Sequence, residues 1–271
     1  MGFLMVLAPQ AYARETLQQR IDALLPGSEL YLPEGKGPFP VSIQMHGCGG
    51  KKNLQERWAK VAKAAGWAVL VVDSYGHRRI STLEAYATVC TGLQLWGRER
   101  AGDLYAMLEW VRRQDWADRN RIVVAGWSHG AWTVLDAMAL QPGEDAEKQT
   151  RLTGLPDEPM AGVVGAFVLY PWQGFGALAP SRGLRLDVPV QAIVGSADNV
   201  VGGKGVARTL VTMKTPRMPI TVELFEGATH AFDEIEAQDW RVRYSPELTA
   251  RAHGMYAGFL GSFRAETSRD Q

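Results

Sequence analysis

Cysteine is scarce in this chain: only Cys48 and Cys90 occur among 271 residues. Two thiols are too few to form a zinc site by themselves. In an oxidising compartment the two could pair as a disulfide, and otherwise they are small buried thiols. The sequence leaves both alternatives open.

An excess of one charge is also missing. Lysine plus arginine and aspartate plus glutamate each number 29, so the formal net charge is zero. We therefore expect no basic surface for nucleic acid or for an anionic membrane. No apolar run is long enough for a membrane-spanning helix, and none is expected. The composition does not indicate an oligomeric state.

The first residues resemble a short export signal. Residues 2–7 are apolar, and Ala11-Tyr12-Ala13 matches an A-x-A cleavage pattern, but the usual positively charged start is absent. Residues 1–13 are therefore a signal peptide or a disordered N-terminus, and residues 14–271 are expected to form one domain. Export would place the protein in the periplasm or outside the cell; otherwise it is cytoplasmic.

Short apolar runs alternate with helical patterns along the rest of the chain. This alternation predicts an α/β fold with a mostly parallel central sheet of about eight strands and helices on both faces. The expected strands are 41–45, 67–72, 121–125, 163–169, 188–194 and 220–225. The expected helices are 53–66, 97–113, 131–140, 202–214 and 248–263. Residues 73–95 indicate a long loop or cap, and residues 141–160 indicate an excursion from the domain.

One short motif stands between an expected strand and an expected helix. Residues 126–130 read Gly-Trp-Ser-His-Gly, which is the G-x-S-x-G pattern of a nucleophile elbow. The two glycines have a steric reason, because strand and helix pass too close there for most side chains. The motif predicts that Ser128 is a nucleophile in a strained turn.

A serine hydroxyl needs a base to take its proton and an acid to orient that base. In elbow proteins the chain order is Ser, Asp or Glu, His, each after a strand. His230 follows the last strand and Asp198 the strand before it, so we expect these as base and acid. Asp187 and Asp233 are weaker rivals for the acid. The alternatives are a structural histidine and a turn or helix-cap aspartate.

The oxyanion of a tetrahedral intermediate needs backbone donors. The amide of His129, next after the serine, is one candidate. The second comes from the His-Gly-Cys-Gly-Gly loop at 46–50, where we favour the amide of Cys48 over that of Gly49. The side chain of His46 is expected to brace this loop. No metal ion or other cofactor is required by these groups.

Five motifs together resemble the dienelactone hydrolase family of α/β-hydrolases. They are H-G-C-G-G at 46–50, V-V-D-S-Y-G at 71–76, G-W-S-H-G at 126–130, G-S-A-D at 195–198 and G-A-T-H-A-F at 227–232. The resemblance implies a single α/β-hydrolase domain, no metal and a small-molecule ester or lactone as substrate. That family uses a cysteine nucleophile, whereas this chain has Ser128, which favours a general serine carboxylesterase.

Substrate contacts are less well marked. Arginines hold a substrate carboxylate in the family that the chain resembles, and Arg78 is a candidate here or a solvated surface residue. Tyr75, Trp127 and Trp172 lie near predicted site loops, where they either wall an aromatic pocket or serve as packing.

The sequence thus predicts a serine hydrolase that cleaves an ester or lactone through an acyl-enzyme. A peptidase of the oligopeptidase type and an acyltransferase share the same chain order and remain alternatives. A binding protein on a hydrolase scaffold is a third, against which the complete set of Ser128, Asp198 and His230 argues.

Overall fold

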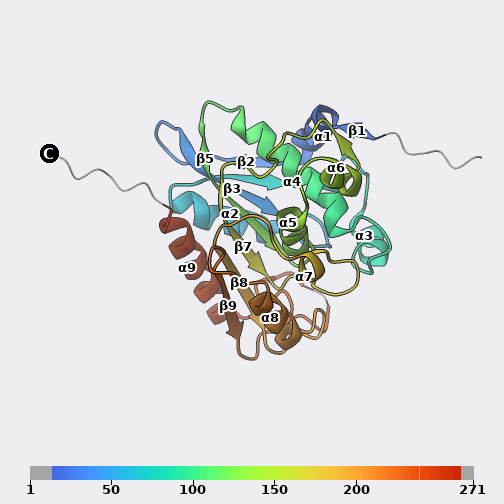
Figure 1. The fold of residues 1–271 in the computed structure, drawn as a ribbon. Coiled ribbons are helices and arrows are strands. Elements are labelled where there is room, and N and C mark those ends of the chain that lie inside the picture. The colour runs from blue at the N-terminus through green and yellow to red at the C-terminus, as the bar shows by residue number, and fades with distance from the viewer. Residues whose placement is uncertain (1–13, 238, 264–271) are drawn as a thin grey trace, which may run out of the picture.

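The central sheet runs through the whole molecule (Figure 1). A computed structural model describes residues 14–237 and 239–263, so the leader expected at 1–13 lies outside the described residues. The strands, in spatial order, are β2 (Glu29–Tyr31), β4 (Ala68–Val72), β3 (Phe39–Met45), β5 (Ala117–Trp127), β7 (Val163–Leu169), β8 (Val190–Gly195) and β9 (Ile220–Phe225). All neighbours pair in parallel except β2, which is antiparallel to β4.

The expected α/β architecture is confirmed, but the strand number is corrected. The described residues form a main sheet of seven strands, not about eight. Two further short strands, β1 (Glu15–Thr16) and β6 (Leu152–Thr153), lie outside the main sheet and pair with each other in a separate two-stranded sheet. Residues 141–160, expected as an excursion, supply β6 and the short helix α6 (Glu144–Thr150).

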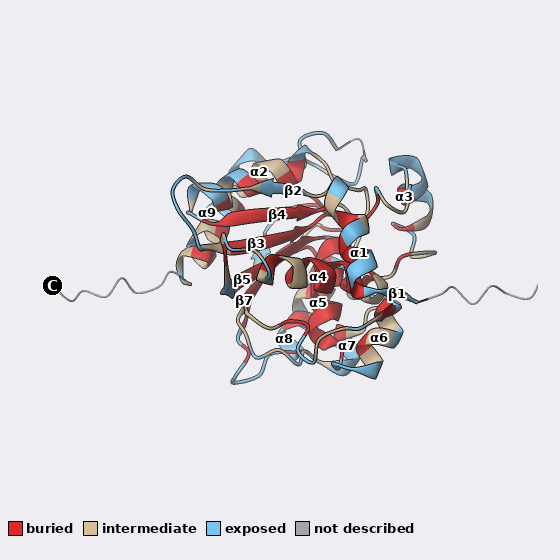
Figure 2. Ribbon diagram, turned by 90° about the horizontal axis from the view of Figure 1, so that it is seen from above, coloured by how far each residue is buried: buried red, intermediate tan, exposed pale blue. Residues whose placement is uncertain are grey.

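Helices cover both faces of the sheet (Figure 2). One face packs against α2 (Asn53–Ala64) and α9 (Pro246–Gly261); the other packs against α1 (Leu17–Leu24), α4 (Gly97–Arg112), α5 (His129–Ala139) and α8 (Gly203–Thr212). Alternation along β5 shows why both faces are apolar. Ile122 and Val124 join the cluster on the α4 and α5 side, while Val123 joins the cluster on the α2 and α9 side.

The segment expected as a loop or cap, 73–95, contains the helix α3 (Thr82–Thr88). Its Ala85 and Val89 pack with Tyr75 and Leu95 in a small cluster apart from the main cores. The remaining helices are the 3-10 turn Leu25–Gly27 and α7 (Ala179–Arg182). Within 14–237 and 239–263, no helix is both long and apolar enough to cross a membrane.

The parallel strands bring distant loops to one edge of the sheet. β3, β5, β7, β8 and β9 all point the same way, so the loops after them meet at their carboxyl ends, where ligands bind in open α/β sheets. These loops hold residues 46–50, Ser128, and the segments beginning at 170, 196 and 226.

Candidate active site

Ser128 occupies a strained turn between β5 and α5. Its φ of 52° and ψ of −112° are unusual for a residue with a side chain. A Cβ on Gly126 would lie 2.4 Å from the Gly130 carbonyl oxygen, and one on Gly130 would lie 2.0 Å from the Met45 carbonyl oxygen. The predicted closeness of strand and helix is confirmed at Gly126, whereas Gly130 is required for a different reason: it packs against the end of β3.

Three side chains from three loops form a continuous hydrogen-bonded line. Ser128 Oγ lies 2.9 Å from Nε2 of His230, and Nδ1 of His230 lies 2.8 Å from Oδ2 of Asp198. A carboxylate only accepts, so Nδ1 carries the proton and Nε2 is left to accept from the serine hydroxyl. The Asp198 side chain is fully buried and that of His230 nearly so, so the bond between them is shielded from bulk water, while the bond to Ser128 is only partly buried.

Backbone amides fix the acid in this line. Oδ1 of Asp198 accepts from the amides of Val200 and Val201, at 2.9 and 3.1 Å. The amide of Ala197 donates to the carbonyl of Ala228, at 3.0 Å, which ties the loop of the acid to the loop of the base. The separation of Asp198 and His230 is therefore set by main-chain bonds.

The two rival aspartates lie elsewhere. Asp187 is exposed before β8. Asp233 is fully buried and accepts from Trp58 Nε1 and the Tyr170 hydroxyl, each at 2.8 Å. Burial raises the pKa of the Asp233 carboxyl. Tyr170 in turn packs edge-on against the imidazole of His230, with 4.7 Å between ring centroids.

The loop after β3 lies directly beside the serine. A Cβ on Gly47 would lie 3.6 Å from Cβ of Ser128. The Gly47 carbonyl accepts from the Gly50 amide, at 3.2 Å, and from Nδ1 of His46, at 2.7 Å. Because a trans peptide holds N–H and C=O in opposite directions, these bonds fix where the amide of Cys48 points. The His46 ring braces the loop, as expected.

The amide of His129 begins α5, where the first N–H groups of a helix have no intrahelical acceptor. The helix dipole adds partial positive charge at this end. The His129 amide thus adjoins Ser128 at the start of α5, and the loop that carries the Cys48 amide lies beside Ser128 at Gly47; their role as oxyanion donors stays a prediction.

Cys48 and Cys90 form a disulfide, with their Cα atoms 5.1 Å apart. The sequence had left this pairing open. The hydroxyl of Tyr75 donates to the Cys48 carbonyl, at 2.8 Å. Tyr75 is only 4% exposed, so it supports the loop from beneath. This corrects the expectation that Tyr75 walls an open pocket.

The other expected substrate contacts are also placed differently. Trp127 is 1% exposed and packs edge-on against Trp58 under α2, because alternation along β5 turns it to that face. Arg78 donates to both oxygens of Asp103, at 2.8 and 2.9 Å, so its guanidinium is engaged inside the protein. Of the two alternatives for Trp127, the structure supports packing; the expectation for Arg78, a substrate contact or a solvated surface residue, is corrected. Trp172 is half-buried in the loop after β7, and its role stays a prediction.

A hollow of about 670 Å³ adjoins the loop after β3. Its walls come from the start of α2, from α3 and from the loop beyond the base; they are Lys52, Thr82, Tyr86, Glu236, Asp239, Trp240 and Arg241. A Cβ on Gly49 would lie 3.0 Å from both Lys52 Nζ and the Tyr86 hydroxyl. We call this feature the α3 hollow. No sequence pattern indicates this hollow, because its walls are far apart in the chain.

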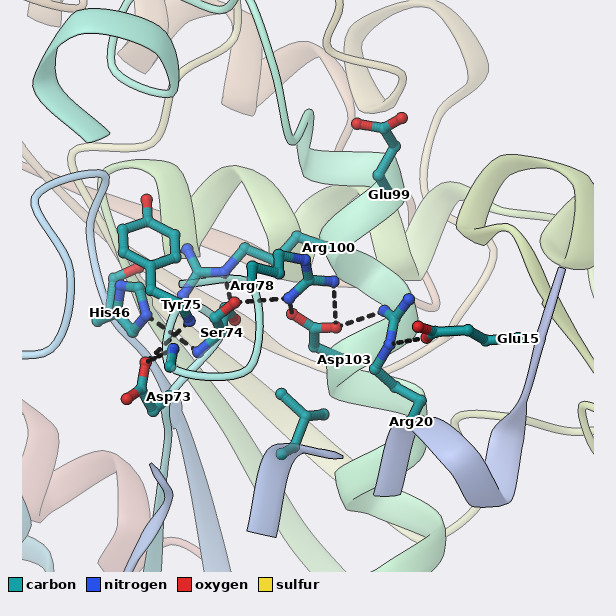
Figure 3. Close-up of polar contacts among 12 residues, drawn as sticks. Glu15, Arg20, His46, Asp73, Ser74, Tyr75, Arg78, Glu99, Arg100 and Asp103 are labelled. Atoms are coloured by element: carbon teal, nitrogen blue, oxygen red, sulfur yellow. Dashed lines mark hydrogen bonds and ion pairs between the residues drawn. The ribbon is translucent and has the colours of Figure 1, made fainter. Parts of the chain in front are cut away.

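A buried polar cluster lies behind the same loop (Figure 3). Asp103 is fully buried and accepts from Arg20, at 2.6 Å, as well as from Arg78. The two arginines hold the pKa of Asp103 well below its usual range, against the opposing effect of burial. No group of three or more His, Cys, Asp or Glu side chains in the described ranges is arranged to hold a metal ion.

Two family models match separate parts of the chain. Residues 160–263, which contain Asp198 and His230, match the dienelactone hydrolase family. Residues 55–144, which contain Ser128, match the prolyl oligopeptidase family. Both families have the α/β-hydrolase fold. No curated protein matches the chain significantly.

Solved structures with the same fold cover nearly all of the described chain. Esterase 2 from Thermogutta terrifontis, with butyrate bound, has a TM-score of 0.62 at 15% identity, covering 90% of this chain and 91% of that one. A dienelactone hydrolase from Anabaena variabilis has a TM-score of 0.59 at 17% identity, with 88% and 92% covered.

A third structure, the dienelactone hydrolase-like promiscuous phosphotriesterase P91 from metagenomic libraries, has a TM-score of 0.60 at 17% identity, with 87% and 91% covered. At such identities these likenesses show the fold. Residues 160–263, which contain the acid and base motifs, are similar to the dienelactone hydrolase family, and the chain as a whole has the α/β-hydrolase fold.

Proposed function

We propose that this protein is a serine hydrolase that cleaves a small-molecule carboxylic ester or lactone. The observation that carries the proposal is the hydrogen-bonded line from Ser128 through His230 to Asp198. A noncatalytic scaffold has no physical need for a strained serine aligned with a buried base and acid.

The mechanism follows from these groups. His230 Nε2 takes the proton of Ser128 as Oγ attacks the ester carbonyl, and the amides of His129 and Cys48 receive the oxyanion. His230 then protonates the leaving alcohol, which leaves an acyl group on Ser128. Water attacks this acyl-enzyme with His230 again as base, and the acid is released. Asp198 holds the imidazole in the required tautomer and stabilises its charged form.

The α3 hollow is the proposed site for the remainder of the ester. It adjoins the oxyanion loop at Gly49, and Tyr86 and Trp240 give it two aromatic walls. Its charged walls are internally paired, because Lys52 bonds Glu234 and Arg241 bonds Asp239. We therefore propose an uncharged, partly aromatic ester over a carboxylate-bearing one.

A series of chromogenic esters with increasing acyl length tests the proposal. Ser128→Ala should lower kcat by about four to six orders of magnitude, with an unchanged unfolding midpoint. An alanine variant that keeps most of the activity overturns the assignment. Added alcohol tests for an acyltransferase, which would yield a new ester in place of the free acid.

A second candidate function is a serine peptidase, since residues 55–144 match the prolyl oligopeptidase family. Short peptide amides, assayed against aryl esters of the same acyl group, separate the two. We expect cleavage of the esters alone. Faster cleavage of the amides would favour the peptidase.

We also propose that the protein works outside the reducing cytoplasm. The support is the disulfide between Cys48 and Cys90, since such bonds persist in oxidising compartments. Thiol titration of the protein from separated cell fractions tests this. Most of the protein should be in the periplasmic or secreted fraction without free thiols; a cytoplasmic pool with two free thiols contradicts it.

A further inference from the structure

Arg100, on α4, is a fully buried arginine whose hydrogen-bond partners are all neutral. Its Nε donates to the Ser74 hydroxyl and its Nη1 to the His46 carbonyl, each at 2.7 Å. Nη1 also lies 3.2 Å from Nδ1 of His129. Figure 3 shows the guanidinium reaching from α4 toward Ser74 and His46.

A single nitrogen thus contacts the two segments that flank the nucleophile. His46 immediately precedes the loop of Cys48, and His129 immediately follows Ser128. The two segments also touch directly, because a Cβ on Gly130 would lie 2.6 Å from the His46 carbonyl oxygen. Arg100 therefore bridges the two segments whose amides receive the oxyanion in the proposed function.

The charge of Arg100 has no bonded carboxylate. Asp103, one helical turn along α4, has its oxygens occupied by Arg20 and Arg78. Nη2 of Arg100 is buried and has no hydrogen-bond partner among the described residues. Burial lowers the pKa of Arg100, but a guanidinium stays protonated in proteins.

An unpaired buried charge is unfavourable in the resting protein. The same charge becomes favourable when negative charge develops nearby, because its field is preorganised and weakly screened. The neutral rings of His46 and His129 permit this arrangement, since burial and the charge of Arg100 lower the pKa of both.

We propose that Arg100 is a positioning residue of the oxyanion hole: it holds the segments of Cys48 and His129 at a fixed spacing and places positive charge behind them. The proposal rests on the proposed function and deepens it. Arg100 does not touch the substrate; it acts through the two amides.

Arg100→Gln and Arg100→Lys test the proposal. The glutamine variant loses both the positive charge and the planar guanidinium that contacts the two segments. Its kcat should fall about a hundredfold, with KM changed less than about threefold. The lysine variant keeps the positive charge but loses the planar guanidinium, so we expect kcat to fall about tenfold. The control is Arg20→Gln, which removes another buried arginine, one that bonds Asp103 and Glu15 and not the oxyanion segments; its kcat should stay within about twofold.

The Ki of a trifluoromethyl ketone distinguishes this role from a purely structural one. The adduct that the ketone forms with the serine carries an oxyanion, so its stability reports on the oxyanion hole. In the folded variants its Ki should rise by the same factor as kcat falls. Ser74→Ala, a small change that frees Nε of Arg100, is the second variant should Arg100→Gln not fold. It should lower kcat about three- to tenfold, with a parallel rise in Ki.

The outcomes separate the two proposals. If the wild type is active and the folded variants Arg100→Lys and Ser74→Ala have unchanged kcat and Ki, the role of Arg100 is overturned. The proposed hydrolase function is then unaffected. Wild type without Ser128-dependent ester hydrolysis overturns the proposed function, and the role of Arg100 with it.

Discussion

The disulfide between Cys48 and Cys90 joins the loop beside Ser128 to the segment that ends α3. Cys48 supplies a proposed oxyanion amide, and α3 forms one wall of the α3 hollow. Apart from this bond, α3 is held mainly by the small cluster around Ala85 and Val89. One covalent link thus couples the reacting centre to a wall of its binding site.

Breaking this link should cost both stability and activity. Reduction, or Cys90→Ser, opens a crosslink that spans 42 residues, and we expect a loss of about 2–4 kcal/mol in the free energy of unfolding. Because the Cys48 loop becomes freer, kcat should also fall. Urea unfolding and ester kinetics with and without a phosphine reductant measure both; identical curves would contradict this role of the disulfide.

The contribution of Asp103 to stability should be largest at neutral pH and should shrink in acid. Asp103→Asn leaves Arg20 and Arg78 without their buried partner, and breaking such a pair costs about 3–5 kcal/mol. Because the folded pKa of Asp103 is lowered, this stability is present above the ordinary carboxyl pKa and is lost as pH falls below it. Exposed Asp22→Asn is the control. An equal cost at pH 7 and at pH 3 would argue against the ion-pair explanation.

Acid should also destabilise the fold through its histidines. Burial lowers the pKa of His46 and His253, of His77 to about 4 and of His129 to about 3. These rings are neutral in the folded state and become charged on unfolding below about pH 6.5, so stability falls as pH drops from there. Asp136, whose pKa burial raises to about 7, offsets about one proton of this uptake.

Urea unfolding between pH 8 and pH 5 measures the effect. Burial also raises the pKa of Asp233, which offsets a further part, so near pH 5 we expect a net uptake of about one to three protons on unfolding. His77→Gln should reduce that uptake by about one. A stability that is flat over this range would contradict the buried, neutral state of the rings.

The α3 hollow should determine the preference for aromatic esters. Trp240, 91% exposed, and Tyr86 are its aromatic walls. Replacing either by alanine should raise KM for aryl esters about two- to tenfold and leave KM for ethyl esters unchanged. Val211→Ala, an exposed apolar residue on α8, is the matched control. Equal changes for both ester types would place the aromatic group elsewhere.

Much of the fold could be predicted from the sequence, because its patterns are local. The strands at 163–169 and 220–225 were predicted with the bounds that the structure has, since each is a short apolar run buried on at least one face. The elbow could also be predicted, because the G-x-S-x-G pattern stands between a strand and a helix; that Gly130 packs against β3 could not be, since Met45 is distant in the chain. The small two-stranded sheet could not be predicted, because residues 15–16 pair with residues 152–153, which are distant in the chain and which no sequence pattern indicates as partners.

The candidate site was predictable where chain order fixes it. Ser128, Asp198 and His230 each follow a strand, and their convergence follows from parallel pairing. The side-chain roles of Tyr75, Arg78 and Trp127 depended on which way each side chain points. One sequence feature could have indicated Arg100: together with Asp103 it interrupts the apolar face of α4. Charged residues on a buried helix face need partners inside the protein.

The central claim is that Ser128 is a nucleophile activated by His230. Treatment with paraoxon followed by mass spectrometry of the peptides tests it most directly. The account predicts one phosphoryl adduct, on Ser128, that appears in step with the loss of esterase activity and is absent from Ser128→Ala and His230→Ala. Loss of activity without an adduct on Ser128, or an equal rate of labelling in His230→Ala, would contradict it.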